Sequence, residues 1–266
     1  MLITPQFTYI HQPKTGGTFV TATLVKIHEA RGDRIETVRI DPASLTQLPN
    51  VETGLVLKLQ LTTRDQHGRY RDIPVQYRNR PVVATIRNPY DRYVSQYEFA
   101  WWRTHPEMFG PVDEVTQAYP RYPDITFADF VHLSNKRLIR YHHPTEPEQT
   151  PGFHTQQFVD FYFRDPGTVY PLLTEAYIES SAYRNDMCNL RLLDQTNLNQ
   201  ELHEFLLSAS YAPAEIEFVR TAEKVFPPEG GRTPEQRWER YYTPELKAFV
   251  RQREGLLFAL FPRFDV

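Results

Sequence analysis

The chain has almost no cysteine. Cys188 is the only one in 266 residues, so a disulfide within the chain is excluded. The small, disulfide-stapled domains that are typical of secreted proteins are therefore excluded too, and the composition suits the reducing cytosol. We expect a cytoplasmic protein.

Long hydrophobic runs and an excess of positive charge are also missing. No stretch approaches the roughly 18 consecutive apolar residues of a membrane span, and the N-terminus lacks the basic segment and apolar run of a signal peptide. The formal net charge is −3, which argues against nucleic acid or an anionic membrane as the main partner. Any positive potential must therefore be local.

Patterns that are typical of metal sites do not occur. The sequence has no His-x-x-x-His and no cysteine pair, and its acidic residues are scattered. We expect no metal cofactor.

The pattern that is present alternates strands with helices. A length of 266 residues with 40% hydrophobic residues supports one large domain over residues 1–266. Seven prolines interrupt residues 104–152, so we expect an insertion there, either an acceptor-binding lid or rigid surface packing. The alternation predicts an α/β fold with a mostly parallel sheet and helices on both faces. The expected strands are 7–11, 36–40, 54–59, 81–86 and 190–194. Two of the expected helices begin at residues 18 and 89, and four others span 127–138, 198–208, 214–226 and 244–261.

The first strand, turn and helix form an anion-binding pattern. The strand at residues 7–11 stops before Pro13, and a helix begins at Thr18, after Gly16 and Gly17. Glycines let a ligand approach the backbone, while the unpaired N–H groups and the dipole of a helix N-terminus favour negative charge. Lys14 adds a mobile positive charge in the turn, and Thr15 and Thr18 add hydroxyl donors. His11 precedes the loop and is expected to fix its geometry.

A second strand ends in a positive charge. Residues 81–86 form a continuous apolar run, as in a central parallel strand, and Arg87 follows it. Asn88 can cap a helix and Pro89 suits its first position. The helix has two faces, one carrying the packing residues Tyr90, Tyr93, Val94, Tyr97 and Trp101, the other Asp91, Ser95, Glu98 and Trp102.

These two segments resemble the sulfotransferases. Pro13-Lys-Thr-Gly-Gly-Thr18 is similar to their 5′-phosphosulfate loop, in the branch that includes the heparan-type carbohydrate enzymes. Residues 81–95 resemble the family's 3′-phosphate block, in which a Ser follows the Arg by eight residues. The loop is not a Walker A motif, since Lys14 precedes the glycines. Weaker similarity covers most of the chain.

The resemblance implies a P-loop-like three-layer α/β fold and transfer of a sulfuryl group from 3′-phosphoadenosine 5′-phosphosulfate (PAPS) to an acceptor hydroxyl or amine. Animal members of this branch carry a membrane anchor, so the chain resembles a soluble, bacterial-like member. A saccharide acceptor is favoured, and a lipid, polyketide or small alcohol stays open.

A late loop with Gly230 and Gly231 resembles the one that closes over the nucleotide. The implied donor-binding residues are Lys14, Thr15, Gly16, Gly17, Thr18, Arg87, Ser95, Arg232 and Thr233.

Three residues compete for the role of general base. His67 is the first choice because histidine titrates near neutral pH. With Gly68 and Asp72 it resembles the His-Gly segment of the uronosyl 2-O-sulfotransferases, which carry a second histidine where this chain has Arg69. Glu98 is the competitor, as other branches use a glutamate. His154 resembles a His-x-x-Gln element on the acceptor side.

Two other functions compete with sulfuryl transfer. A nucleotide-dependent kinase would need the Walker order of lysine and glycine and an aspartate that holds Mg²⁺, and neither is evident. A catalytically silent nucleotide-binding module would tolerate the loss of His67 and Glu98.

Overall fold

The chain forms two compact units in a computed structural model that describes residues 1–41, 48–62, 65–139, 150–223, 225 and 232–266. Unit 1 consists of Met1–Arg87 and Met187–Glu229, and unit 2 of Asn88–Asp186 and Gly230–Val266. The single domain expected over residues 1–266 stays a prediction.

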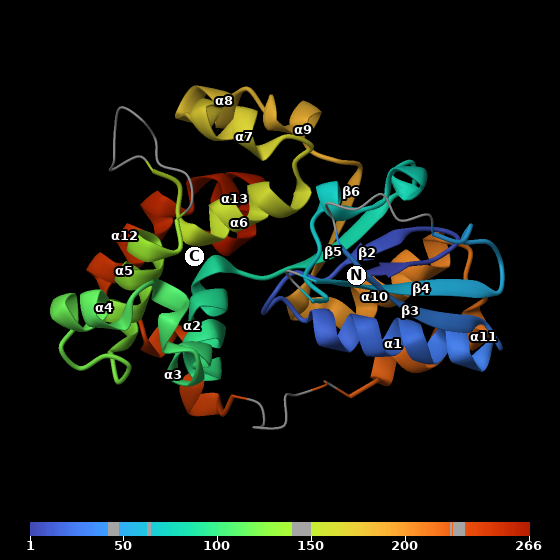
Figure 1. Cartoon of the computed structure of the whole chain (residues 1–266), viewed down its shortest axis with the longest axis horizontal. Coiled ribbons are helices and arrows are strands. Elements are labelled where there is room, and N and C mark those ends of the chain that lie inside the picture. The colour runs from blue at the N-terminus through green and yellow to red at the C-terminus, as the bar shows by residue number, and fades with distance from the viewer. Residues whose placement is uncertain (42–47, 63–64, 140–149, 224, 226–231) are drawn as a thin grey trace. The chain divides into compact units, whose positions relative to one another are not determined.

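Unit 1 contains a six-stranded sheet in the order β3-β4-β1-β2-β5-β6 (Figure 1). The short β1 runs antiparallel to β2 and β4, and all other neighbours are parallel. The expected α/β class with a mostly parallel sheet flanked by helices is therefore confirmed. The strands are β1 (Leu2–Ile3), β2 (Thr8–Ile10), β3 (Arg34–Ile40), β4 (Leu55–Leu61), β5 (Val82–Ile86) and β6 (Leu190–Asp194).

The register of the parallel strands places two sequence segments at one edge. Ile10 of β2 lies opposite Ala84 of β5, and Ile86 of β5 lies opposite Asp194 of β6. Carboxyl ends of parallel strands meet at the same edge of a sheet, where α/β proteins bind ligands. The loop after β2 and Arg87 after β5 therefore begin at this edge.

Two helices of unit 1, α1 (Gly17–Ala30) and α10 (Leu198–Ser208), pack on this sheet (Figure 1). Both helices carry apolar residues at helical spacing, and these residues belong to one hydrophobic core. The core that they share with the strands includes Val20, Leu24, Ile27, Leu202, Leu206, Tyr9 and Val83.

The helix expected over 214–226 was wrong in its length. The structure has α11 (Pro213–Ile216) followed by a 3-10 helix (Glu217–Thr221), and residues 224 and 226 lie outside the described residues. The side-chain amide of Asn199 donates to the carbonyls of Val219 and Ala222, both at 2.8 Å. These hydrogen bonds orient the two carbonyls toward α10, which favours the 3-10 helix over a continued α-helix.

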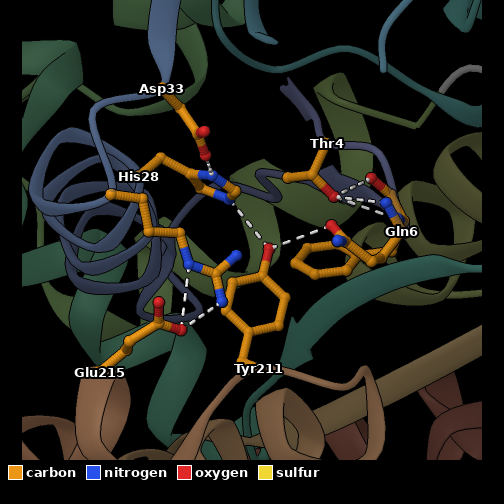
Figure 2. Close-up of polar contacts among 8 residues, drawn as sticks. Thr4, Gln6, His28, Asp33, Tyr211 and Glu215 are labelled. Carbon is orange, nitrogen blue, oxygen red and sulfur yellow. Dashed lines mark hydrogen bonds and ion pairs between the residues drawn. The ribbon is translucent and has the colours of Figure 1, made fainter. Parts of the chain in front are cut away.

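A buried polar cluster anchors the C-terminal end of α1 (Figure 2). Nδ1 of His28 lies 2.6 Å from Oδ2 of Asp33, and its Nε2 lies 2.8 Å from the hydroxyl of Tyr211. Arg31 stacks on the Tyr211 ring and donates to Glu215. Burial lowers the pKa of His28 and raises that of Tyr211 to about 12, so both groups are neutral at pH 7.

Unit 2 is helical. The expected helix over 127–138 is present as α5, and the one over 244–261 is divided at Glu254 into α12 and α13. The buried Glu254 carboxylate accepts hydrogen bonds from the N–H groups of His154 and Thr155 at the start of α6, which ties the break in place. The helices are α2 (Pro89–Phe99), α3 (Trp101–Thr104), α4 (Val112–Ala118), α5 (Phe127–Arg137), α6 (Phe153–Tyr162), α7 (Pro166–Val169), α8 (Glu175–Glu179), α9 (Tyr183–Asp186), α12 (Pro244–Arg253) and α13 (Gly255–Leu260).

The two tryptophans after α2 exchange their expected places. Trp101 is 48% exposed, whereas Trp102 is 1% exposed and lies in the core. The helical period stops at Phe99 because Ala100 adopts a left-handed conformation with φ 50°. Asn88 caps α2 as expected, since its side chain accepts from the Tyr90 N–H.

Candidate functional site

The loop between β2 and α1 contains two residues in the left-handed region. Lys14 has φ 62° and Gly16 has φ 97°. Glycine adopts this conformation without strain, but a lysine there costs of order 1–3 kcal/mol and such outliers cluster at functional sites. Left-handed residues within a turn direct backbone N–H groups toward a common centre, which is a recognised arrangement for binding anions.

Both glycines of the loop are required by their surroundings. A Cβ on Gly17 would lie 2.1 Å from Cδ2 of His11, and one on Gly16 would lie 2.8 Å from Cδ2 of Leu198. The imidazole of His11 therefore occupies the space that a side chain at position 17 would need.

The N-terminus of α1 suits a negatively charged ligand. Its first turn has no acidic residue, no side chain caps it, and Thr18 is exposed. The first N–H groups of a helix have no partner within the helix and carry its positive dipole end. With Lys14 in the preceding loop, this end of the helix has the groups that could hold a phosphate or sulfate.

Thr15 has a different role from the one its hydroxyl suggested. The side chain is fully buried, and Oγ1 donates to the Gln12 carbonyl at 2.9 Å and lies 2.6 Å from Oγ1 of Thr85 on β5. The hydroxyl thus holds the loop against the sheet. Donor binding by Thr15 stays a prediction, with its backbone N–H as the contributing group. Thr85 was missed, because a threonine inside a buried strand resembles any other β-branched residue.

Arg87 joins the two sequence segments within unit 1. It is half-buried at the end of β5, and its Nη1 donates to the carbonyl of Lys14 at 3.3 Å. The guanidinium therefore lies directly against the loop. Its five N–H donors allow it to hold this carbonyl and a phosphate oxygen together.

His67 also reaches this loop. Its ring is half-buried, Nδ1 lies 3.0 Å from the carbonyl oxygen of His11, and the two imidazoles meet edge to face at 4.9 Å. His11 is 4% exposed, and burial followed by the proximity of His67 lowers its pKa to about 3. His11 is therefore neutral at pH 7, and its ring lies against Gly17 at the start of α1.

The remaining predicted donor-binding residues, Ser95, Arg232 and Thr233, lie in unit 2. Nη2 of Arg232 pairs with Oδ1 of Asp91 at 2.5 Å, one turn before the buried Ser95. The N–H of Thr233 donates to Oε1 of Gln236 at 2.8 Å.

The other two candidates for the base also lie in unit 2. The Glu98 carboxylate accepts hydrogen bonds from the Gln236 side chain and, at 2.6 Å, from the Tyr241 hydroxyl. His154 is fully buried, stacks on Tyr93 with ring centroids 3.9 Å apart, and has its Nε2 2.8 Å from Oε1 of Gln96.

Unit 1 thus brings together Lys14, Thr15, Gly16, Gly17, Thr18, Arg87 and His67, whereas Ser95, Glu98, Arg232, Thr233 and His154 belong to unit 2. Across the described residues there is no group of three or more His, Cys, Asp or Glu that could hold a metal ion. No helix in the described part of the chain is long and apolar enough to cross a membrane.

Comparison with known proteins finds similarity in structure. The chain matches no protein-family model and no curated protein sequence. The crystal structure of mouse sulfotransferase SULT7A1 complexed with PAP is similar over 96% of this chain and 83% of that chain, with 13% sequence identity and a TM-score of 0.45.

Proposed function

We propose that the chain is a sulfotransferase that moves a sulfuryl group from PAPS to an acceptor hydroxyl. The observation that carries this proposal is the loop before α1, where left-handed Lys14 and Gly16, the start of a helix and the Arg87 guanidinium come together. The sequence of this loop is the one that resembles the 5′-phosphosulfate loop.

The proposed donor contacts follow from charge. Lys14 and the amides of Gly16, Gly17 and Thr18 bind the 5′-phosphosulfate, in the manner of helix N-terminal phosphate sites. The 3′-phosphate is assigned to Arg87, whose planar fork matches a phosphate. Ser95, Arg232 and Thr233 are assigned to the same phosphate by the family resemblance.

The proposed reaction is an in-line transfer. The acceptor oxygen forms a bond to sulfur while the bond from sulfur to the phosphate oxygen breaks, and the acceptor proton passes to a base. The leaving 3′-phosphoadenosine 5′-phosphate (PAP) gains negative charge at its 5′-phosphate. Lys14 stabilises that charge, and positioning supplies most of the rest, as in phosphoryl transfer.

We assign the base to His67. Glu98 already accepts two hydrogen bonds, and His154 is buried with its Nε2 against an amide oxygen. His67 lies instead in unit 1, where its ring contacts the residue that precedes the Lys14 loop. The acceptor that the resemblance favours is a saccharide hydroxyl.

Calorimetric titration tests this function. PAP should bind more tightly than adenosine 5′-phosphate, because the 3′-phosphate adds contacts, and more tightly than ATP–Mg²⁺. A preference for ATP–Mg²⁺ would support a kinase instead. Absence of binding to all three nucleotides would overturn the proposal.

Turnover is the second part of the test. Release of PAP from PAPS is followed with panels of saccharides, small alcohols and amines as acceptors. Release that depends on an acceptor and on Lys14 supports transfer. Tight PAP binding without release in any panel would favour a silent nucleotide-binding module.

A further inference from the structure

The hydrogen bond at His67 determines which of its ring nitrogens can accept a proton. Nδ1 lies 3.0 Å from the backbone oxygen of His11. A carbonyl oxygen only accepts hydrogen bonds, so Nδ1 must carry the hydrogen. In the neutral imidazole the lone pair then lies on Nε2.

That carbonyl is held firmly in place. His11 directly follows β2 and is 4% exposed. Its ring fills the space above Gly17, where a Cβ would come within 2.1 Å, and its Nδ1 lies 3.4 Å from the Thr21 hydroxyl. The backbone oxygen that holds His67 is thus fixed to the first turns of α1, three residues before Lys14.

The chain on the other side of His67 is anchored as well. Nε and Nη2 of Arg69 donate to both oxygens of Asp72 at 2.8 and 2.9 Å, and the Arg69 N–H donates to the same carboxylate at 2.9 Å. Asp72 is 6% exposed. Arg69, at the position where the resembled branch has a second histidine, therefore stabilises the turn that carries His67.

From these contacts we infer that His11 is a positioning residue: its backbone carbonyl, held by its buried ring, selects the Nδ1–H tautomer of His67 and makes Nε2 the proton acceptor of the transfer. The catalytic part of this inference rests on the proposed function, whereas the tautomer does not. The neutral state of His11 fits this role, because a positive charge beside His67 would weaken it as a base.

Nitrogen-15 NMR of protein labelled at histidine tests the tautomer directly. Long-range correlations, assigned with His67→Asn and His11→Gln, should show His67 protonated at Nδ1 and unprotonated at Nε2. In His11→Gln both tautomers should be populated, since the ring that fixes the carbonyl is gone. An Nε2–H tautomer in the wild-type protein, or no change in His11→Gln, would overturn the inference.

Two substitutions at His67 distinguish the hydrogen bond that positions its ring from the transfer of the proton. The side-chain amide of His67→Asn sits close to Nδ1 and can still donate to the His11 carbonyl, whereas that of His67→Gln sits close to Nε2 and cannot. We expect His67→Asn to melt near the wild-type temperature and His67→Gln about 2–4 °C lower, the loss of one hydrogen bond. Both should slow PAP release from PAPS by about 10²-fold or more. Equal melting temperatures would contradict the proposed contact.

Titration with PAP links the tautomer to the reaction. The pKa of His67 should rise when PAP binds, because nearby phosphate charge favours the imidazolium. The NMR signals of the exposed His132 serve as the reference. PAP binding without a shift at His67 would overturn the catalytic part of the inference. If PAP does not bind at all, the proposed function fails, and the tautomer measured by NMR still decides the positioning.

Discussion

The candidate residues of the two units differ in what holds them. In unit 1, Arg87 and His67 are held by backbone carbonyls, and Lys14 by the loop's own conformation. In unit 2, Arg232 pairs with the Asp91 carboxylate and also donates to the Gln236 carbonyl, and Glu98 accepts from two side chains. The Lys14 loop takes its shape from the backbone itself, whereas Arg232 would have to leave Asp91 to bind a ligand, so we expect unit 1 to contain the prearranged part of the site.

This difference has an energetic meaning. Arg232 and Asp91 are only 24% and 17% exposed, so water screens their ion pair weakly. A phosphate that binds Arg232 must compete with the Asp91 carboxylate. The free energy of that ion pair is subtracted from what Arg232 contributes to phosphate binding. We therefore expect substitutions in unit 1 to have the larger effects on donor binding and turnover.

The largest effect should follow Lys14→Ala. Removing the charge that we propose to stabilise the leaving phosphate should slow PAP release from PAPS by about 10²–10³-fold, the usual cost of one such group. Melting temperature should hardly change, because the side chain lies in a half-buried loop. Lys26→Ala, at an exposed position on α1, is the matched control and should keep full activity. Wild-type turnover in a folded Lys14→Ala protein would contradict the mechanism.

Arg87→Ala and Arg232→Ala compare the two units directly. Loss of a charge-assisted contact at Arg87 should weaken PAP about 10–100-fold and leave adenosine 5′-phosphate almost unaffected. Arg232→Ala should weaken PAP only a few-fold, because Asp91 competes for that guanidinium in the wild-type protein. Calorimetry with both nucleotides measures each effect. A larger loss in Arg232→Ala would reverse the comparison.

Sequence patterns predicted unit 1 well where neighbours along the chain decide the structure. The strand before Arg87, the strand at 190–194 and the helix at 198–208 are all present. The expected boundaries failed where distant residues decide. Strand β1 has only two residues and exists because β2 and β4 pair with it. Glu254 ends α12 because its carboxylate binds the start of α6.

The candidate site follows the same division. The motifs identified Lys14, Gly16 and Arg87, but they could not show that Arg87 contacts the Lys14 carbonyl. They likewise could not distinguish the Thr15 hydroxyl, which holds the loop against Thr85, from one that faces a ligand. Such assignments depend on which strands become neighbours, and a single sequence does not record that.

Glycine substitutions measure how tightly each unit is packed. A Cβ on Gly17 would meet the His11 ring at 2.1 Å, and one on Gly152 would meet Oε1 of Glu254 at 2.4 Å. Each alanine substitution should lower the free energy of unfolding by about 1–3 kcal/mol, as overpacking does. Gly255→Ala, with nothing within 4 Å, is the control and should be neutral or stabilise by about 0.4–1 kcal/mol.

Denaturant unfolding of the three variants measures these changes. Gly17→Ala should also weaken PAP binding, because the displaced His11 ring disturbs the loop, whereas Gly152→Ala should affect stability alone. Equal effects of both variants on PAP binding would argue against a site prearranged in unit 1.

Acid should affect the two units in opposite directions. The pKa of His11 is lowered to about 3, so below its ordinary value of 6.5 the unfolded chain binds a proton that folded unit 1 does not. The stability that this provides is present above pH 6.5 and is lost as the pH falls, by about 2 kcal/mol between pH 7 and pH 5. His28, whose pKa is also lowered, acts in the same direction.

The buried carboxyl of unit 2 has the opposite sign. Burial raises the pKa of Glu254 above its ordinary value of 4.5, so folded unit 2 retains a proton at a pH where the unfolded chain has lost it. Its stabilising contribution is present at low pH and is lost as the pH rises through the folded pKa. Hydrogen exchange, corrected for the intrinsic pH dependence, should show β2 and α1 losing protection between pH 7 and pH 5 while α6 keeps or gains it. His11→Gln should flatten the first response and Glu254→Gln the second, because each removes the titrating group. Parallel loss of protection in both units would mean that these buried groups do not control the pH dependence of stability.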